Sequence, residues 1–310
     1  MRKRLFPTIL TGILWLGAAN LASATDLDTI KERGVLRHLG IPYANFVTGS
    51  GDGLDVEVTQ RFAKYLGVRY EYVESSWERV FGDLTGKQVP QNGSTAVRDV
   101  PIRGDLIASG LTVLPWREKL LDYSDPTFPS AVWLIARADS KTAPIAGSGN
   151  RQRDIAATKT KIGRSSLLVK EATCLDPALY DLNGKGLDIR NYARSTNPNE
   201  MVPAILNHLA EMTLLDVPDA LMALEKWPGQ IKVIGPISDV QIMAAGFRKS
   251  SPDLRQAFNA FLESIKRDGT YASLTRKYYP TALRYFPEFF AAAAPRDAGP
   301  RPKAGEIAFK

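Results

Sequence analysis

Short strand-like and helix-like segments alternate along most of this chain, and this alternation restricts the fold more than any other feature of the sequence. A strand is predicted at residues 35–39. A helix is predicted to follow from Asp55, as its N-cap, to Leu66, because Val58 and Phe62 would share one face. Strands and helices in alternation are typical of α/β proteins. The predicted fold class is therefore α/β.

The same alternation continues toward the C-terminus. Further strands are predicted at residues 70–73, 105–108, 132–136, 166–169 and 212–215, and helices at residues 77–84 and 201–210. A short helix is predicted to begin at Pro115, and a long one to follow Ser251 and end at Gly269. The apolar face of the long helix consists of Leu254, Phe258, Phe261, Leu262 and Ile265.

The first 24 residues have the three parts of a secretory signal. Residues 2–4 are basic, residues 9–16 are apolar and too short for a permanent membrane span, and residues 22–24 (ASA) form a small-residue cleavage site. No cysteine stands directly after this site, so we expect no lipid anchor. The mature chain is expected to start at Thr25 and to reside in the periplasm.

Charge and composition exclude several classes of protein. The chain has 40 basic and 33 acidic residues, which gives a net charge of +7. The signal holds three of the basic residues and no acidic one, so the 286 residues of the mature chain carry a net charge of +4. A mild excess without a basic, aromatic stripe argues against nucleic-acid binding. One cysteine cannot form an intramolecular disulfide, and two distant histidines, His38 and His208, do not indicate a zinc site.

Several ordered motifs carry a family resemblance. The most specific is SGLTVLPWR at residues 109–117 followed by DYSDP at 122–126. Others are LRHLGIPYANF at 36–46, GLDVEV at 53–58, FAKYLG at 62–67, VKEAT at 169–173, GTY at 269–271 and KYY at 277–279. This set resembles the bacterial extracellular solute-binding proteins of family 3, which are periplasmic receptors of polar amino-acid importers.

The resemblance implies a two-lobed periplasmic-binding-protein fold with a hinge and a ligand cleft between the lobes. After the signal peptide (1–24), lobe 1 would comprise residues 25–136 and 238–285, and lobe 2 residues 137–237, with crossovers near Ala136 and Ile234. Residues 286–310 are expected to be a disordered tail. The general tendency of α/β sheets to bind ligands beyond the carboxyl ends of their strands predicts the same cleft.

The resemblance assigns the ligand carboxylate to Arg117. A planar guanidinium can meet both oxygens of a carboxylate, although a single arginine is more often a surface charge. Gly110 would let the backbone approach the ligand, and Thr112 would add a hydroxyl and an N–H.

Asp216 is expected to accept the ligand ammonium, also by resemblance. Its alternative role is to cap the helix that begins near Pro218. Asp219 is expected to be a charge at the start of that helix.

Backbone N–H groups of Thr173 and Cys174 are expected to point at the anion. The family usually has glycine where this chain has Ala172. Cys174 could equally be an inert buried thiol, and Lys170 is expected to be solvated.

Tyr43, Phe46 and Trp77 match positions where the family places aromatic walls around the ligand, and stacking or cation–π contact would justify them. Core packing is the alternative for each. The other tryptophans considered are assigned to packing: Trp116, Trp133 and Trp227.

Together these features predict the substrate-binding subunit of an ABC importer. It would capture a small zwitterionic solute, such as an amino acid, by hinge closure and deliver it to an inner-membrane permease. We expect a monomer without enzymatic activity, cofactor, metal or nucleic-acid partner. Lysine and arginine are disfavoured as ligands, because the opening loop lacks the acidic residue that many receptors for basic amino acids carry.

Three other functions stay open. The first is an enzyme similar to cyclohexadienyl dehydratases, for which Glu200 and Glu211 are the carboxylates to inspect. The second is the receptor-like half of a lytic transglycosylase. The third is an accessory or sensor protein that binds a protein partner, suggested by the long insertion at residues 87–104, which is expected to be a mobile surface loop.

The signal predicts export with cleavage before Thr25. Intact-mass measurement of protein isolated from the periplasm should give a chain that begins at Thr25 and carries no lipid. A mass that retains Met1, or that includes an acyl group, would contradict this assignment.

Overall fold

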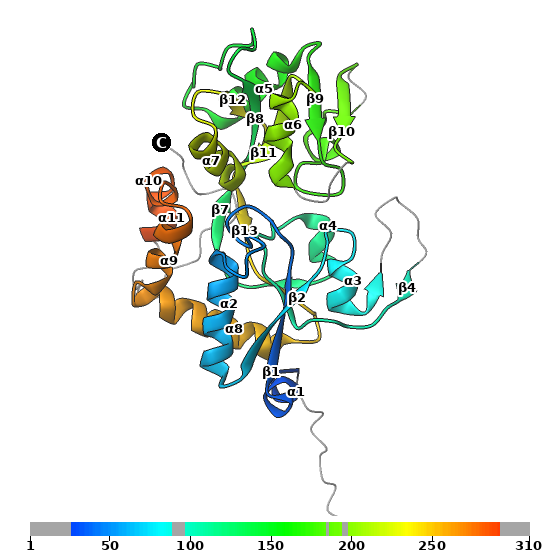
Figure 1. Ribbon diagram of the computed structural model, residues 1–310, viewed down its shortest axis with the longest axis vertical. Coiled ribbons are helices and arrows are strands. Elements are labelled where there is room, and N and C mark those ends of the chain that lie inside the picture. Colours follow the sequence, from blue (N-terminus) through cyan, green and yellow to red (C-terminus); the bar gives the residue numbers. More distant parts are fainter. Residues whose placement is uncertain (1–25, 89–96, 184–185, 194–197, 292–310) are drawn as a thin grey trace, which may run out of the picture.

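The structure is a computed structural model that describes residues 26–88, 97–183, 186–193 and 198–291. Two lobes are stacked along the long axis of the molecule and meet at a narrow waist (Figure 1). The predicted signal peptide lies outside the described residues. None of the described helices is long and apolar enough to cross a membrane.

The first lobe is built on a five-stranded sheet in the order β2-β1-β5-β14-β6. Strand β1 (Val35–Gly40) pairs in parallel with β2 (Arg69–Glu74) and β5 (Leu106–Ile107). Strand β14 (Gly246–Phe247) is antiparallel to β5 and to β6 (Asp122–Tyr123). The chain from Gly246 onward therefore returns to complete the first lobe.

Helices α2 (Leu54–Leu66), α8 (Pro252–Arg267) and α9 (Thr270–Tyr278) pack with this sheet around one aromatic core. All five predicted core residues of α8 are buried. The ring of Phe62 on α2 lies 5.1 Å from that of Phe258 on α8. The smaller helices of this lobe are α1 (Asp26–Arg33), α3 (Val80–Thr85) and α4 (Pro115–Glu118).

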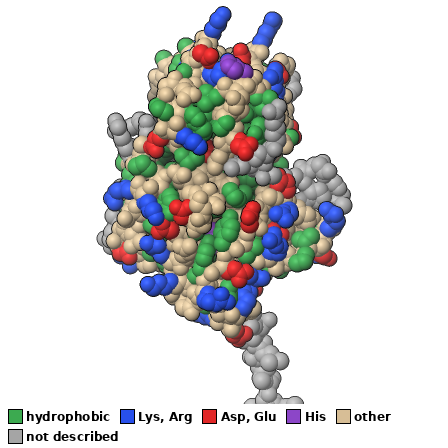
Figure 2. All heavy atoms as spheres, viewed as in Figure 1, with side chains coloured by type: hydrophobic (Ala, Val, Ile, Leu, Met, Phe, Trp, Pro, Cys, Tyr) green, Lys and Arg blue, Asp and Glu red, His purple; other side chains and the backbone are tan. Residues whose placement is uncertain are grey.

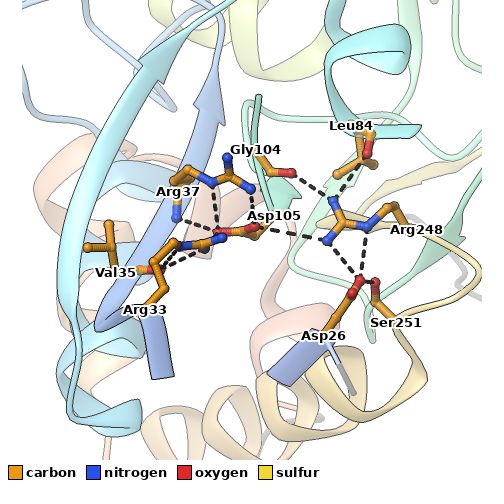
Figure 3. A network of polar contacts seen from close by, with 9 residues as sticks. All are labelled: Asp26, Arg33, Val35, Arg37, Leu84, Gly104, Asp105, Arg248 and Ser251. Atoms are coloured by element: carbon orange, nitrogen blue, oxygen red, sulfur yellow. Dashed lines mark hydrogen bonds and ion pairs between the residues drawn. The ribbon is translucent and has the colours of Figure 1, made fainter. Parts of the chain in front are cut away.

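A buried carboxylate ties the start of the described chain to the first lobe (Figure 3). Asp105, at the entry to β5, forms ion pairs with Arg33 and Arg37 and lies 3.9 Å from Arg248. Arg248 also donates to Asp26 in α1, at 2.8 and 2.9 Å. These charge-assisted bonds join α1, β1, β5 and the segment before α8, and so link both chain portions of the lobe.

The second lobe has a five-stranded sheet in the order β10-β9-β11-β8-β12. Strand β11 (Met212–Asp216) is parallel to β9 (Ser166–Val169) and antiparallel to β8 (Val132–Arg137). Strands β10 (Asp188–Asn191) and β12 (Ile231–Pro236) form the two edges. The expected lobe boundary at residue 136 is wrong, because β8 pairs along its whole length within the second sheet.

The helices of the second lobe differ from expectation at two places. Helix α5 (Arg151–Ile162) is not among the predicted helices. Helix α6 (Met201–Leu206) ends before residue 210, since His208 adopts the left-handed conformation with φ of 59°. Helix α7 (Val217–Lys226) follows β11 directly. Two short 3-10 turns complete the lobe, η1 (Pro177–Tyr180) and η2 (Pro198–Glu200).

Two antiparallel strands form the waist. Strand β7 (Phe128–Ser130) leads into the second lobe, and β13 (Gln241–Met243) leads out of it. The chain therefore crosses between the lobes twice. These are the positions where a hinge would absorb backbone rotation.

The insertion at residues 87–104 begins and ends as a hairpin at the side of the first lobe (Figure 1). Strands β3 (Lys87–Gln88) and β4 (Arg98–Asp99) pair, and the Val100 N–H donates to the Gly86 carbonyl at 3.0 Å. Its expected mobile part, residues 89–96, lies outside the described residues.

Residues 286–291 are ordered, so this part of the expected tail is wrong. Helices α10 (Ala282–Tyr285) and α11 (Pro287–Ala291) lie against both lobes. Phe286 packs with Ala131, Val217 and Leu221, and the ring of Phe290 lies 5.7 Å from that of Phe128. These contacts form because the second lobe presents an apolar face on α7. Residues 292–310 lie outside the described residues.

Phe286→Ala should destabilise the protein by about 3 kcal/mol, because it removes a buried ring from this cluster. Chemical denaturation measures the free energy of unfolding. Glu288→Ala is the matched control, since Glu288 lies in the same segment and is exposed; we expect a change within about 0.5 kcal/mol. Equal effects of the two substitutions would show that the segment does not dock.

Candidate functional site

A small cavity lies between the lobes, at the carboxyl ends of several strands. Its volume is about 10 Å³, close to the space that one water molecule needs. Seven of the nine predicted ligand-binding residues line it, and Phe46 and Asp216 lie behind the lining. The lining residues are Tyr43, Trp77, Gly110, Thr112 and Arg117 from the first lobe and Thr173, Cys174 and Leu175 from the second.

Arg117 is a buried cation without a carboxylate partner among the described residues. It is 1% exposed, and its Nη1 donates to the Thr112 carbonyl at 2.9 Å. The rings of Trp116, Trp77 and Phe81 lie 5.1, 5.3 and 5.5 Å from its guanidinium carbon. Its Nε has no hydrogen-bond partner, and burial lowers its pKa. A buried guanidinium with an unused donor suits an incoming anion.

Gly110 holds the loop that carries this arginine. Its φ of 57° is left-handed, and an added Cβ would collide with the ring of Phe46. The Gly110 N–H donates to the Asp55 carboxylate at 2.6 Å. The predicted N-cap role of Asp55 is therefore wrong: Gly53 precedes the helix, and Asp55 braces the loop from the first turn of α2. Phe46 supports the loop from the core rather than lining the cavity.

Asp216 ends β11 and faces the first lobe. It is fully buried, accepts the hydroxyl of Tyr43 from the opposite lobe, and lies 3.7 Å from the Cys174 sulfur. Its Oδ1 has no hydrogen-bond partner. Asp216 directly precedes α7. The backbone N–H of Asp219 acts on the Asp216 carboxylate and opposes the rise of its pKa, although the geometry is not that of a capping hydrogen bond.

Asp219 lies in the first turn of α7 as predicted, but it is buried, so the expectation of a charged side chain there is wrong. It is 3% exposed, and neither of its carboxyl oxygens has a hydrogen-bond donor within the part of the chain that the structure describes. Burial raises its pKa well above the ordinary value, and the nearby charge of Asp216 raises it further. The sequence contains one signal of this arrangement. Asp216 and Asp219 are three residues apart at a helix start, and residues with that spacing lie on the same side of a helix.

The loop after β9 supplies the second-lobe wall. Ala172 adopts a left-handed φ of 60° where the family usually has glycine. Thr173 donates its hydroxyl to the Lys170 carbonyl at 2.7 Å and accepts the Leu175 N–H at 3.0 Å. Burial raises the pKa of the Cys174 thiol, which keeps it neutral. Lys170 was expected to be solvated, yet it is 8% exposed and donates to the Tyr192 carbonyl at 3.0 Å.

The aromatic side chains form one wall of the cavity. Tyr43 and Trp77 are both buried, and their rings meet edge to face at 5.8 Å. Trp116 packs on Phe81, as assigned, but it also covers the guanidinium of Arg117. Trp133 packs against the core of the second lobe.

A larger groove of about 570 Å³ opens outward from the cavity. The two spaces share Trp77 and Thr173. Both charge signs line the groove, with Lys170 against Glu78, Glu171 and Asp176. On the face shown in Figure 2, basic and acidic side chains are interspersed over the lower lobe, without a patch of one sign.

Glu200 and Glu211 lie outside both spaces and are exposed. The Tyr192 hydroxyl donates to Glu200 at 2.7 Å. Within the described part of the chain, no three His, Cys, Asp or Glu side chains come together as a metal site.

Residues 102–281, more than half of the chain, match the family of bacterial extracellular solute-binding proteins, family 3. The L-cystine-binding protein TcyJ of Escherichia coli K12 is 24% identical, with 82% of this chain and 85% of that protein aligned. A probable amino-acid ABC transporter-binding protein of Haemophilus influenzae is 22% identical, with 90% and 98% aligned.

A third relative is larger. Membrane-bound lytic murein transglycosylase F of Desulfosudis oleivorans is 27% identical over 236 residues, which are 76% of this chain and 45% of that protein. The chain thus spans about half the length of this relative.

Solved structures share the fold. A mutant of ArgBP from T. maritima has a TM-score of 0.63 at 22% identity, covering 82% of this chain and 99% of its own. The ancestral amino acid-binding protein AncCDT-1, a precursor of cyclohexadienyl dehydratase, also has a TM-score of 0.63, at 23% identity, covering 83% and 100%. The predicted two-lobed α/β fold is confirmed.

Asp55→Asn should remove a loss of stability that the wild type suffers at alkaline pH. Burial raises the pKa of Asp55 to about 7. The folded protein therefore keeps a proton that the unfolded chain releases above about pH 4, so stability falls as pH rises through about 7. We expect wild type to lose a few kcal/mol relative to the variant, since each pKa unit corresponds to about 1.4 kcal/mol.

Denaturation curves between about pH 5 and pH 8 measure this difference. Asp253→Asn is the matched control, because Asp253 occupies the corresponding first-turn position of α8 and is only partly buried. If the Asp55→Asn and wild-type curves stay parallel, Asp55 is ionised in the folded protein.

Proposed function

Because the chain belongs to the bacterial extracellular solute-binding proteins of family 3, we propose that it captures a small zwitterionic solute, an amino acid or a close relative, in the cleft between its lobes. It resides in the periplasm as a monomer, and hinge closure traps the ligand. The loaded form delivers the ligand to an inner-membrane ABC permease.

The observation that carries this proposal is the buried, unpaired guanidinium of Arg117. A charge removed from water is costly unless it is paired, and the aromatic rings around Arg117 supply only part of the compensation. A ligand carboxylate would accept from the fork of the guanidinium. Thr112 lies in the same cavity wall and adds its backbone N–H, whereas the Gly110 N–H already donates to Asp55.

The opposite end of the ligand belongs to the second lobe. Asp216 receives the ammonium, and it already accepts a donor from the first lobe in the Tyr43 hydroxyl. Carboxylate and ammonium sites on different lobes make closure depend on the ligand, since neither lobe alone satisfies both charges.

The groove sets the character of the ligand side chain. It continues from the cavity past Trp77 and Thr173 and carries both charge signs, so it accommodates an extended polar substituent. Among the similar proteins, TcyJ is named for L-cystine, and an ancestral relative of known structure is bound to arginine. L-cystine is the better candidate here, because its distal end carries an ammonium and a carboxylate, whereas arginine offers only a cation.

A thermal-shift screen tests the proposal. The panel contains L-cystine, L-arginine and the other free amino acids beside their N-acetyl and decarboxylated analogues. Ligand at about 100 times its dissociation constant adds about 2.7 kcal/mol of apparent stability, a rise of several degrees. We expect hits among free amino acids only.

Variants show which charge holds which end. Arg117→Met and Asp216→Asn should each weaken binding by about 2–5 kcal/mol, because each strands one ligand charge in the closed cleft. Arg117→Lys keeps the charge but loses the fork, and should recover only part of the affinity. Arg267→Met is the control, since Arg267 is exposed on α8.

Two outcomes would contradict the proposal. A hit that lacks an amine and tolerates Asp216→Asn would indicate a plain carboxylate ligand. The absence of any hit would favour the accessory-protein alternative.

A second candidate function is an enzyme on the same fold. The buried carboxyl groups of Asp216 and Asp219, both with raised pKa, are the kind of groups that general acid catalysis needs. Incubation with prephenate or arogenate, followed by detection of an aromatic product, tests it. Product formation that is lost in Asp219→Asn would establish the enzyme.

A further inference from the structure

Two carboxyl groups lie buried together where β11 meets α7. Those of Asp216 and Asp219 are within hydrogen-bonding reach of each other. Three of their four oxygens accept no hydrogen bond from the described residues. Neither carboxyl group takes part in an ion pair with any residue that the structure describes. Their charge is therefore not balanced from within this part of the chain.

One cation lies near the pair but does not neutralise it. Arg117, across the cavity, acts on Tyr43, Cys174 and Tyr180 as the pair does, yet the described residues show no ion pair between it and either carboxyl group. The uncharged ionisable side chains that act on the pair come from two loops, from η1 and from the position after α9. Each has a pKa raised mainly by burial, so each stays neutral: Tyr43, Cys174, Tyr180 and Tyr279. Two ionised carboxylates in such a place repel each other without screening, and a close acid pair commonly keeps one proton.

A shared proton also explains the contact between the two groups. Two carboxylates are both acceptors and cannot bond to each other. With one proton present, Asp219 can donate to Asp216, while Tyr43 donates to Asp216 from the other lobe. Each donor in the cluster then has an acceptor.

We propose that Asp216 and Asp219 hold one proton between them in the ligand-free protein, and that the ligand ammonium displaces this proton when it binds. This inference rests on the proposed function, because it concerns the ammonium end of the same site. The proton leaves to solvent, and the N–H groups of the ammonium take its place as donors. The charge of the cluster stays at minus one, since the pair gains one negative charge and the ligand brings one positive charge.

The exchange makes affinity depend on pH. One proton released per ligand strengthens binding by up to about tenfold per pH unit while the free pair is protonated. A single ionised aspartate would give no such slope near neutral pH. The pair also disfavours ligands without a cationic group, because they cannot replace the proton.

The ligand-free protein provides the first test. Because the folded pair keeps a proton that the unfolded chain releases above about pH 4, wild-type stability should fall between about pH 5 and pH 8. Asp219→Asn removes that proton but retains a donor to Asp216, so its melting temperature should fall less, and the gap should widen with pH. Asp253→Asn, in the first turn of α8, should follow the wild-type slope. Parallel curves for wild type and Asp219→Asn would overturn the shared proton.

Calorimetry provides the second test, with L-cystine and L-arginine as probes in buffers of different ionisation enthalpy at about pH 6.5. Wild type should release about one proton for each probe molecule bound, and Asp219→Asn close to none while it still binds. Binding to wild type without proton release would overturn the inference and leave the proposed function intact. Failure of both probes, and of the wider panel, to bind would contradict the proposed function, while the ligand-free comparison would still decide the shared proton.

Discussion

The burial of one guanidinium is the constraint on which the rest of the site depends. Arg117 is removed from water, yet no carboxylate among the described residues neutralises it. Three aromatic rings and the Thr112 carbonyl hold it in one orientation. Removing a guanidinium from water costs free energy, and these contacts compensate for only part of that cost. In the proposed function, an anion that enters the cleft would supply the missing partner. The scaffold of the first lobe serves to keep that donor in place.

The second lobe buries carboxyl groups at the cleft, whereas the first lobe buries a cation there. Asp216 and Asp219 bury two carboxyl groups at one helix start, and the thiol of Cys174 lies within the influence of both Asp216 and Arg117. Cation and anions are thus supplied by different lobes on either side of a small cavity. In the function proposed above, closing the lobes would bring both groups to one ligand, so the energy of closure would come from charges that are costly when the ligand is absent.

The connection between the lobes is broader than two strands alone. Besides β7 and β13, the segment with Phe286 and Phe290 packs against α7 of the second lobe and against Phe128 of the waist. Opening that separates α7 from this segment would expose the apolar ring of Phe286. Any opening of the lobes at β7 and β13 would therefore also involve a region beyond residue 281, where the family match ends.

Local patterns in the sequence by themselves determined the main elements: the face of α8, the short helix that begins at Pro115, and the strands that end at the cleft. The family resemblance adds the two lobes and the importance of Arg117. What only the tertiary structure decided is the burial of individual polar groups. Sequence position alone predicts a helix cap for Asp55, a charge at a helix start for Asp219 and a solvated side chain for Lys170. Each is instead enclosed by segments distant along the chain, and burial, which sets both pKa and hydrogen-bond partners, depends on those segments rather than on sequence neighbours.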